Sequence, residues 1–143
     1  MKKITQYYLS IILLVTALSF SSCTDNNDPN AKCEDLFCTE EFRTILISIK
    51  DQNQTPVIID SFKVIDLSND NDITIPVSAS GLQLYQQNGQ YPLVNDMSFE
   101  QNVKTQIQFF GYKDNQEIIN EKYTVSTDCC HISLVSGTIE IML

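Results

Sequence analysis

The sequence predicts an all-β protein, an antiparallel β-sandwich of about seven or eight strands that follows a cleaved signal peptide. Three observations lead to this prediction. Several segments alternate apolar and polar residues, which is the period of a half-buried strand. Polar, turn-forming residues separate these segments at short intervals. After the N-terminal apolar run, no stretch shows a convincing helical pattern, so we expect two sheets that each bury one face.

The first half of the domain contains two well-marked strands. In residues 43–50, Ile45, Ile47 and Ile49 fall on one face of an extended chain. Residues 57–67 are rich in β-branched and aromatic side chains, as expected for the second strand. Four weaker features follow: an edge strand over 73–77 that contains Pro76, a short strand over 82–85, a hairpin turn at Asn88-Gly89, and an undecided region over 90–99.

Alternation is clearest in the last third of the chain. Residues 103–109 alternate apolar and polar side chains, residues 113–116 form a turn, and residues 117–126 form the next strand. The last two strands are separated by a turn at Ser136-Gly137. Cys130, Ile132 and Leu134 share one face of the first of them, and Ile139, Ile141 and Leu143 mark the second.

Residues 1–22 have the three-part plan of a secretory signal peptide. Lys2 and Lys3 form a short positive region, an apolar run follows over 9–18, and the small residues Ser21 and Ser22 come next. The run is too short to span a bilayer comfortably, and it lacks the polar face of a buried helix. We therefore expect export and cleavage.

The stretch Phe20-Ser21-Ser22-Cys23 resembles the lipobox of bacterial lipoproteins. The resemblance implies that Cys23 becomes a lipidated N-terminus that anchors the protein to a membrane. Thr24 stands where an Asp would mark inner-membrane retention, which implies the outer membrane. The acidic, Asn-rich run over 24–28 looks like the tethers of Bacteroidota surface lipoproteins and implies exposure at the cell surface. Ordinary secretion without a lipid is the alternative.

The charge of the mature chain limits its partners. Cleavage before Cys23 would remove two of the nine basic residues and none of the 18 acidic ones, which leaves a net charge of about −11. Such a charge opposes binding to nucleic acid. We expect an envelope protein or a glycan as partner, and no cofactor.

Four cysteines remain when Cys23 carries a lipid, an even number that suits disulfides in an oxidising compartment. Cys129 and Cys130 are adjacent on a predicted strand, so their side chains should point to opposite faces. We expect each to bond one cysteine of the pair Cys33 and Cys38. Each bridge would close a loop of about 90 residues and contribute roughly 4 kcal/mol. A local Cys33–Cys38 bridge, with Cys129 and Cys130 paired together or free, is the alternative.

A metal or redox site at Cys129-Cys130-His131 is the competing functional interpretation. Thiolates and an imidazole are sufficient zinc ligands, but adjacent cysteines and a Cys-x4-Cys spacing differ from the usual Cys-x2-Cys pairs. Redox enzymes generally carry Cys-x-x-Cys at the start of a helix. His131 is the chain's only histidine and its only ready general base near neutral pH. No nucleophile set surrounds it in sequence, which favours a structural role.

Two resemblances bear on the domain itself. Residues 45–60, with Ile47, Ile49, Pro56 and Val57, resemble the opening of carboxypeptidase-regulatory-like or transthyretin-like domains. This resemblance implies a non-catalytic, immunoglobulin- or transthyretin-like sandwich. The paired early cysteines and the late Asp128-Cys129-Cys130-His131 are similar to small Bacteroidota surface lipoproteins without an assigned activity.

These observations divide the chain into a lipoprotein signal peptide (1–22), a lipidated flexible tether (23–32) and a β-sandwich domain (33–143). We expect a lipid-anchored envelope protein with a non-catalytic binding or structural role, not an enzyme.

Overall fold

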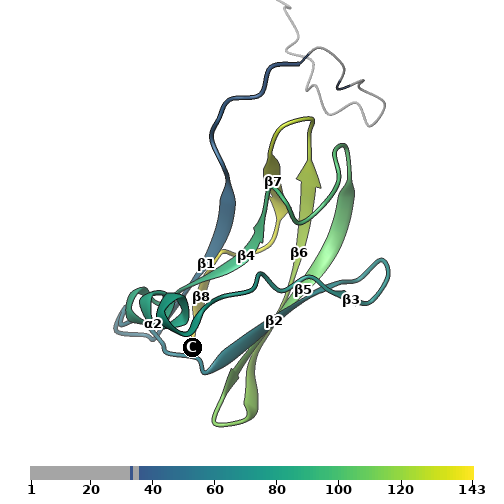
Figure 1. The fold of residues 1–143 in the computed structure, drawn as a ribbon. Helices are drawn as coiled ribbons and strands as arrows, with labels where there is room; N and C mark the ends of the chain where they lie inside the picture. Colours follow the sequence, from purple (N-terminus) through teal and green to yellow (C-terminus); the bar gives the residue numbers. More distant parts are fainter. Residues whose placement is uncertain (1–32, 34–35) are drawn as a thin grey trace, which may run out of the picture.

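The computed structural model describes Cys33 and residues 36–143 and arranges them in two packed β-sheets (Figure 1). The larger sheet has the strand order β3-β2-β5-β6-β7, and the smaller has the order β4-β1-β8. The predicted all-β sandwich is therefore correct. The signal peptide, Cys23 and the rest of the predicted tether lie outside the described residues. The elements are β1 (Thr44–Lys50), β2 (Ser61–Asp66), β3 (Asn71–Asp72), α2 (Ala79–Asn88), β4 (Gln90–Asn95), β5 (Lys104–Lys113), β6 (Gln116–Thr127), β7 (Ile132–Ser136) and β8 (Glu140–Met142).

The core lies between the two sheets, and alternation places its side chains there. Phe62 of β2 stacks on Phe109 of β5 with ring centroids 5.7 Å apart, and it meets Tyr91 of β4 edge-on at 6.0 Å. These contacts join the larger sheet to the smaller one, as aromatic pairs commonly do in cores. The fully buried side chains of the core include Ile47, Ile49, Ile59, Val64, Tyr91, Leu93, Ile107 and Phe109.

The β5–β6 hairpin is the longest paired unit, and its turn follows from its sequence. Lys113 pairs with Gln116, so Asp114 and Asn115 form a two-residue loop. Both adopt positive φ angles, 51° and 60°. Tight hairpin turns need this conformation, and Asn and Asp tolerate it well. The predicted turn over 113–116 is confirmed.

Helix α2 corrects the expectation that no helix follows the signal peptide. Ser78 caps its start, since the Ser78 hydroxyl accepts a hydrogen bond from the Gly81 amide at 3.1 Å. Gly89 ends the helix in the left-handed conformation with φ 61°, so Asn88-Gly89 terminates a helix and is not a hairpin turn. Residues 82–85, predicted as a strand, lie inside α2, and no helical side chain is fully buried. In the part of the chain that the structure describes, no helix is long and apolar enough to span a bilayer.

Two further pairings differ from the prediction. The edge strand expected over 73–77 is absent there, and β3 is confined to two residues before it. The Thr74 hydroxyl accepts a hydrogen bond from the Val64 amide at 2.8 Å, where a backbone carbonyl would accept it in a regular ladder. Strand β8 pairs in parallel with β1, because the chain crosses from one sheet to the other after β7. Gly137 makes that crossing with φ 122°, and a Cβ there would lie 2.3 Å from the Tyr123 ring.

Candidate functional site

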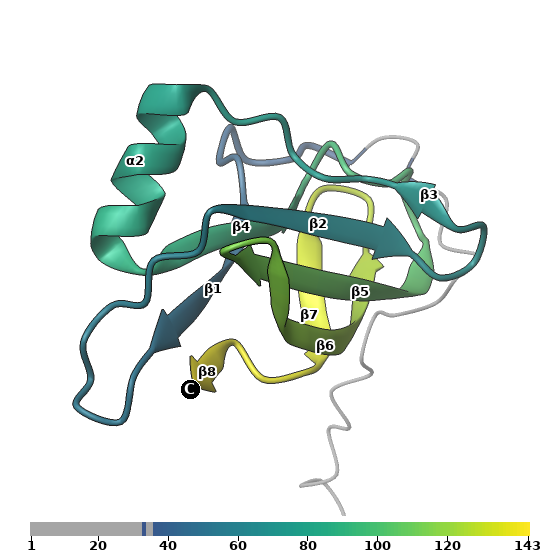
Figure 2. The same cartoon turned by 90° about the horizontal axis from the view of Figure 1, so that it is seen from below.

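Three segments that are distant in sequence meet at one end of the sandwich. They are Cys33 with residues 36–43, the β4–β5 loop over 96–103, and the β6–β7 loop over 128–131. We call this assembly the clamped end. In Figure 1 the chain arrives there at the top of the molecule, whereas α2 and the C-terminus lie at the bottom. Figure 2, turned by 90° from Figure 1, shows the two sheets and α2 from below.

Two disulfides fasten the arriving chain to the β6–β7 loop. Cys33 bonds Cys129 with an S–S distance of 2.07 Å, and Cys38 bonds Cys130 at 2.01 Å. This is the cross-pairing favoured by the sequence, and the local Cys33–Cys38 bridge is not formed. Cys129 and Cys130 were predicted to lie on a strand, but they lie in a loop after β6. A bend in the backbone, and not strand alternation, directs the adjacent cysteines to separate partners.

Asp128 produces that bend. Its carboxylate oxygen Oδ1 accepts hydrogen bonds from the amides of Cys130 and His131, each at 2.7 Å. The Asp128 amide donates to the His131 carbonyl at 3.1 Å and closes the loop. Burial alone would raise the pKa of Asp128, but these amide bonds outweigh it and lower the pKa. Asp is a common turn residue because its side chain bonds the backbone two residues on, so Asp128 had a local signal that the sequence interpretation overlooked.

His131 connects the β6–β7 loop to the other two segments. Its Nδ1 lies 3.1 Å from Oδ2 of Asp96, and its Nε2 lies 3.0 Å from the Thr39 hydroxyl. Only about a tenth of each side chain is exposed, 10% for His131 and 11% for Asp96. Because an ionised carboxylate only accepts hydrogen bonds, Nδ1 carries a proton. His131 is therefore a hydrogen-bonded residue beside a disulfide.

Asp96 is the centre of this network, although no sequence pattern singled it out. In addition to His131, it accepts from the Arg43 amide through Oδ2 and from the Ile132 amide through Oδ1, both at 2.7 Å. Burial tends to raise the pKa of Asp96, and the hydrogen bonds from the two amides and the imidazole overcome this and lower it. One carboxylate thus links the start of β1, the start of β7 and the ring of His131. These partners are 53, 36 and 35 residues away, so no local pattern could reveal them.

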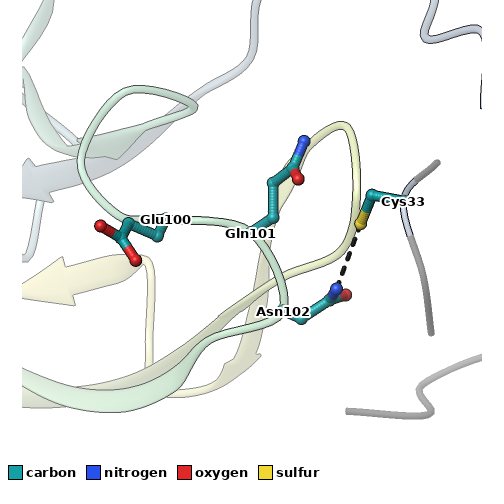
Figure 3. A pocket seen from close by; sticks show the side chains of 4 residues that line it. All are labelled: Cys33, Glu100, Gln101 and Asn102. Atoms are coloured by element: carbon teal, nitrogen blue, oxygen red, sulfur yellow. Dashed lines mark hydrogen bonds between the residues drawn. The ribbon is translucent and has the colours of Figure 1, made fainter. Parts of the chain in front are cut away.

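The side-chain amides of Gln101 and Asn102, in the β4–β5 loop, complete the clamped end. Figure 3 shows Asn102 directed at Cys33, with its Nδ2 donating to the Cys33 sulfur at 3.1 Å. Gln101 donates through Nε2 to the Cys129 carbonyl at 2.8 Å. Glu100, Gln101, Asn102 and Cys33 line an open hollow of about 710 Å³. Its wide opening describes a surface depression and not an enclosed ligand cavity.

The order Thr39–His131–Asp96 resembles the hydroxyl–imidazole–carboxylate chain of hydrolases, but the surroundings oppose that chemistry. The hollow beside His131, about 110 Å³, is also lined by Asp96, Glu100 and Asp128. Carboxylates there would destabilise an oxyanion. The nearby amides of Cys130 and His131 already bond Asp128, and that of Ile132 bonds Asp96, so none of the three is free to stabilise an oxyanion. The hydrogen bonds of His131 and Asp96 join the three chain segments of the clamped end.

The disulfides also change the chemistry available to the Cys129-Cys130-His131 cluster. A bridged sulfur offers no thiolate, which is the form that binds metal or attacks a disulfide. Across the residues that the structure describes, no group of three or more His, Cys, Asp and Glu side chains is placed to hold a metal ion.

Fold and site together define a small β-sandwich whose point of chain entry is clamped by two disulfides and a buried His–Asp network. Comparisons with protein-family models, with curated proteins and with solved structures found no match to this chain.

Proposed function

We propose that this protein is a lipid-anchored lipoprotein of the outer membrane, exposed at the cell surface, whose sandwich has a non-catalytic binding or structural role. The N-terminal pattern ending at Cys23 supports export and anchoring, and the acidic mature chain suits an envelope protein or a glycan as partner. The resemblance of the N-terminus and of the cysteine pattern to Bacteroidota surface lipoproteins supports the same proposal.

The observation that carries the proposal is the position of the clamp. The first described residue, Cys33, is bonded to Cys129, and Cys38 is bonded to Cys130. Any pull on the preceding chain is therefore transmitted through covalent bonds to the β6–β7 loop before it reaches strand β1. Such an arrangement suits a domain that is displayed on an N-terminal anchor. Two disulfides also suit an oxidising compartment outside the cytoplasm.

The test is lipid labelling of the full-length chain, expressed in bacteria that process lipoproteins. Cells grown with an alkyne fatty acid should label the wild-type protein and place it in the detergent-soluble membrane fraction. Cys23→Ala should lose both the label and the membrane association. Cys33→Ala is the matched control, because it removes a cysteine of the clamp and should keep the label. Equal labelling of wild type and Cys23→Ala would contradict the anchor.

The non-catalytic role has its own test at His131. His131→Asn keeps a side chain that can bond Asp96, and it should leave surface display and partner capture unchanged. A metal or redox site would lose its function in this variant. Stoichiometric zinc in the purified wild-type protein, or reactive thiols after folding in air, would overturn the proposal of a structural clamp.

A further inference from the structure

Four of the most exposed apolar side chains of the described residues gather at the clamped end. Phe37 is fully exposed, Met97 is 83% exposed, and Leu36 and Phe42 are 58% and 57% exposed. Water contact of this extent is unfavourable for each side chain, and clusters of exposed apolar residues generally mark interaction sites.

The backbone pairing explains why the four residues share one end. Just beyond the Thr44–Asn95 pair that ends the β1–β4 ladder, the Asp96 amide donates to the Arg43 carbonyl at 3.1 Å, and the Arg43 amide donates to the Asp96 carboxylate. Phe42 and Met97 come one residue beyond Arg43 and Asp96, in the segments that precede β1 and follow β4. Phe37 precedes Cys38, which bonds Cys130 beside the His131–Asp96 pair. Leu36 adjoins Phe37, so all four side chains belong to the surface around the clamp.

The clamp holds these side chains outward. Cys38 is bonded to Cys130 of the β6–β7 loop, and Leu36 and Phe37, which come just before it, lie exposed to solvent outside the core. On the other side, the Arg43 amide is fixed by Asp96 at 2.7 Å, which sets the position of Phe42. A fixed apolar surface avoids the ordering cost that a mobile loop would incur on contact.

We infer that this surface, formed by Leu36, Phe37, Phe42 and Met97, rests on the lipid membrane to which the chain is anchored. The inference rests on the proposed anchor at Cys23. Cys33 follows Cys23 by ten positions, and an extended chain of that length spans at most about 35 Å. The clamped end is therefore the part of the domain held nearest the bilayer. An apolar surface at that place has lipid as its first available partner.

The charges around the surface specify the kind of lipid. Glu40, Glu41, Glu100 and Asp128 belong to the clamped end, as the apolar side chains do, and Arg43 is already paired with Glu41 at 3.3 Å. Acidic groups oppose contact with anionic headgroups, so the partner is a zwitterionic lipid surface. The contact would fix the orientation of the domain with α2 and the C-terminus directed away from the membrane, as Figure 1 places them at the opposite end.

The absence of tryptophan from the sequence allows a direct test. The chain from Cys23 onward is coupled through the thiol of residue 23 to a maleimide lipid in phosphatidylcholine vesicles. Single variants Phe37→Trp and Met97→Trp report on the clamped end. Leu84→Trp on α2 is the matched control, because Leu84 is 59% exposed at the opposite end of the sandwich. Each variant is checked for two intact disulfides by its mass before and after alkylation.

We expect the tryptophan fluorescence of Phe37→Trp and of Met97→Trp to shift to the blue and to be quenched by brominated lipid, with no change for the control. No response at either position, or an equal response of the control, would overturn the inference. A blue shift that instead depends on protein concentration without vesicles would assign the surface to contact between copies, which would also overturn it. Because the coupling is chemical, failure here is separate from failure of Cys23 lipidation in cells.

Discussion

The interior of the sandwich and its clamped end are stabilised by different kinds of interaction. Phe109 and Ile47 are fully buried among apolar neighbours, and the Tyr91 hydroxyl satisfies its hydrogen bonds with the backbone of Val57 and Ile59. The clamped end instead uses covalent bonds and the buried carboxylate of Asp96. Apolar packing responds little to pH or to thiol reagents, whereas disulfides respond to thiol reagents and carboxylate networks respond to pH. The difference provides a way to perturb each region separately.

Removal of both disulfides should produce the largest effect. Replacement of Cys33, Cys38, Cys129 and Cys130 by alanine opens two long loops that share one constraint, so their contributions do not add in full. We expect the free energy of unfolding to fall by about 5 kcal/mol. Urea denaturation followed by circular dichroism measures the change, and Cys23→Ala in the chain from residue 23 onward serves as the control. A fall of less than about 1 kcal/mol would show that the interior alone supports the fold.

Truncation in the interior should cost nearly as much but should be insensitive to reductant. Phe109→Ala leaves a cavity beside Phe62, and we expect a loss of about 4 kcal/mol. Phe110→Ala is the matched control on the same strand. Alternation places Phe110 on the outer face, where it pairs with Lys63 of β2 and Asn120 of β6. Its loss should lower the free energy of unfolding by only about 1 kcal/mol. The added effect of reductant should be the same in wild type and in Phe109→Ala, because distant sites act additively. Strong coupling between them would contradict the separation of the two regions.

The same two regions differ in how far the sequence predicts them. Strands β1, β5 and β6 follow from alternation, because local patterning decides which face of a strand is buried. The strand expected over 82–85 was wrong, since Ser78 and Gly89 cap a helix there, and Leu82 and Tyr85 pack against the core from one side of it. The parallel pairing of β8 with β1 depends on where the chain crosses between sheets, which local patterning does not specify.

At the clamped end, the sequence identified the cysteines but not the carboxylates. The even number of cysteines and the adjacency of Cys129 and Cys130 led to the expected cross-pairing, which the structure contains. Asp96 bonds groups on three separate segments, and its role arises only when β1, β4 and β7 are brought together. Asp96 resembles the chain's other carboxylates in sequence. Long-range polar networks of this kind need the fold before they can be recognised.

Asp96→Asn should have an intermediate effect that depends on pH. The side-chain amide of the variant would direct an N–H group at the backbone amide of Arg43 or of Ile132. One hydrogen bond would therefore be replaced by a repulsive contact between two donors. We expect a loss of about 2 kcal/mol near pH 7. The folded pKa of Asp96 is lowered below its unfolded value, so the stability that it contributes is present above the unfolded pKa and disappears as pH falls through the folded pKa. The difference between wild type and variant should therefore shrink on acidification below about pH 4.

Glu41→Gln is the control for that measurement. The ion pair of Glu41 with Arg43 is exposed, with 62% and 47% of the two side chains accessible, so its loss should change stability by less than about 0.5 kcal/mol. A stability curve for Asp96→Asn that runs parallel to that of wild type between about pH 7 and pH 3 would contradict the role assigned to this carboxylate.

Removal of the Thr39 hydroxyl should lower stability least, and it tests how far the polar network of the clamped end extends. Thr39 lies 3.0 Å from Nε2 of His131 but is itself exposed, so water can replace its hydroxyl when it is removed. Thr39→Val should cost about 0.5 kcal/mol, and Thr39→Ser should restore wild-type stability. A loss above about 2 kcal/mol would mean that the imidazole depends on Thr39 as much as on Asp96. A small loss would place the boundary of the polar network at His131, with the disulfides and Asp96 sufficient to hold the arriving chain.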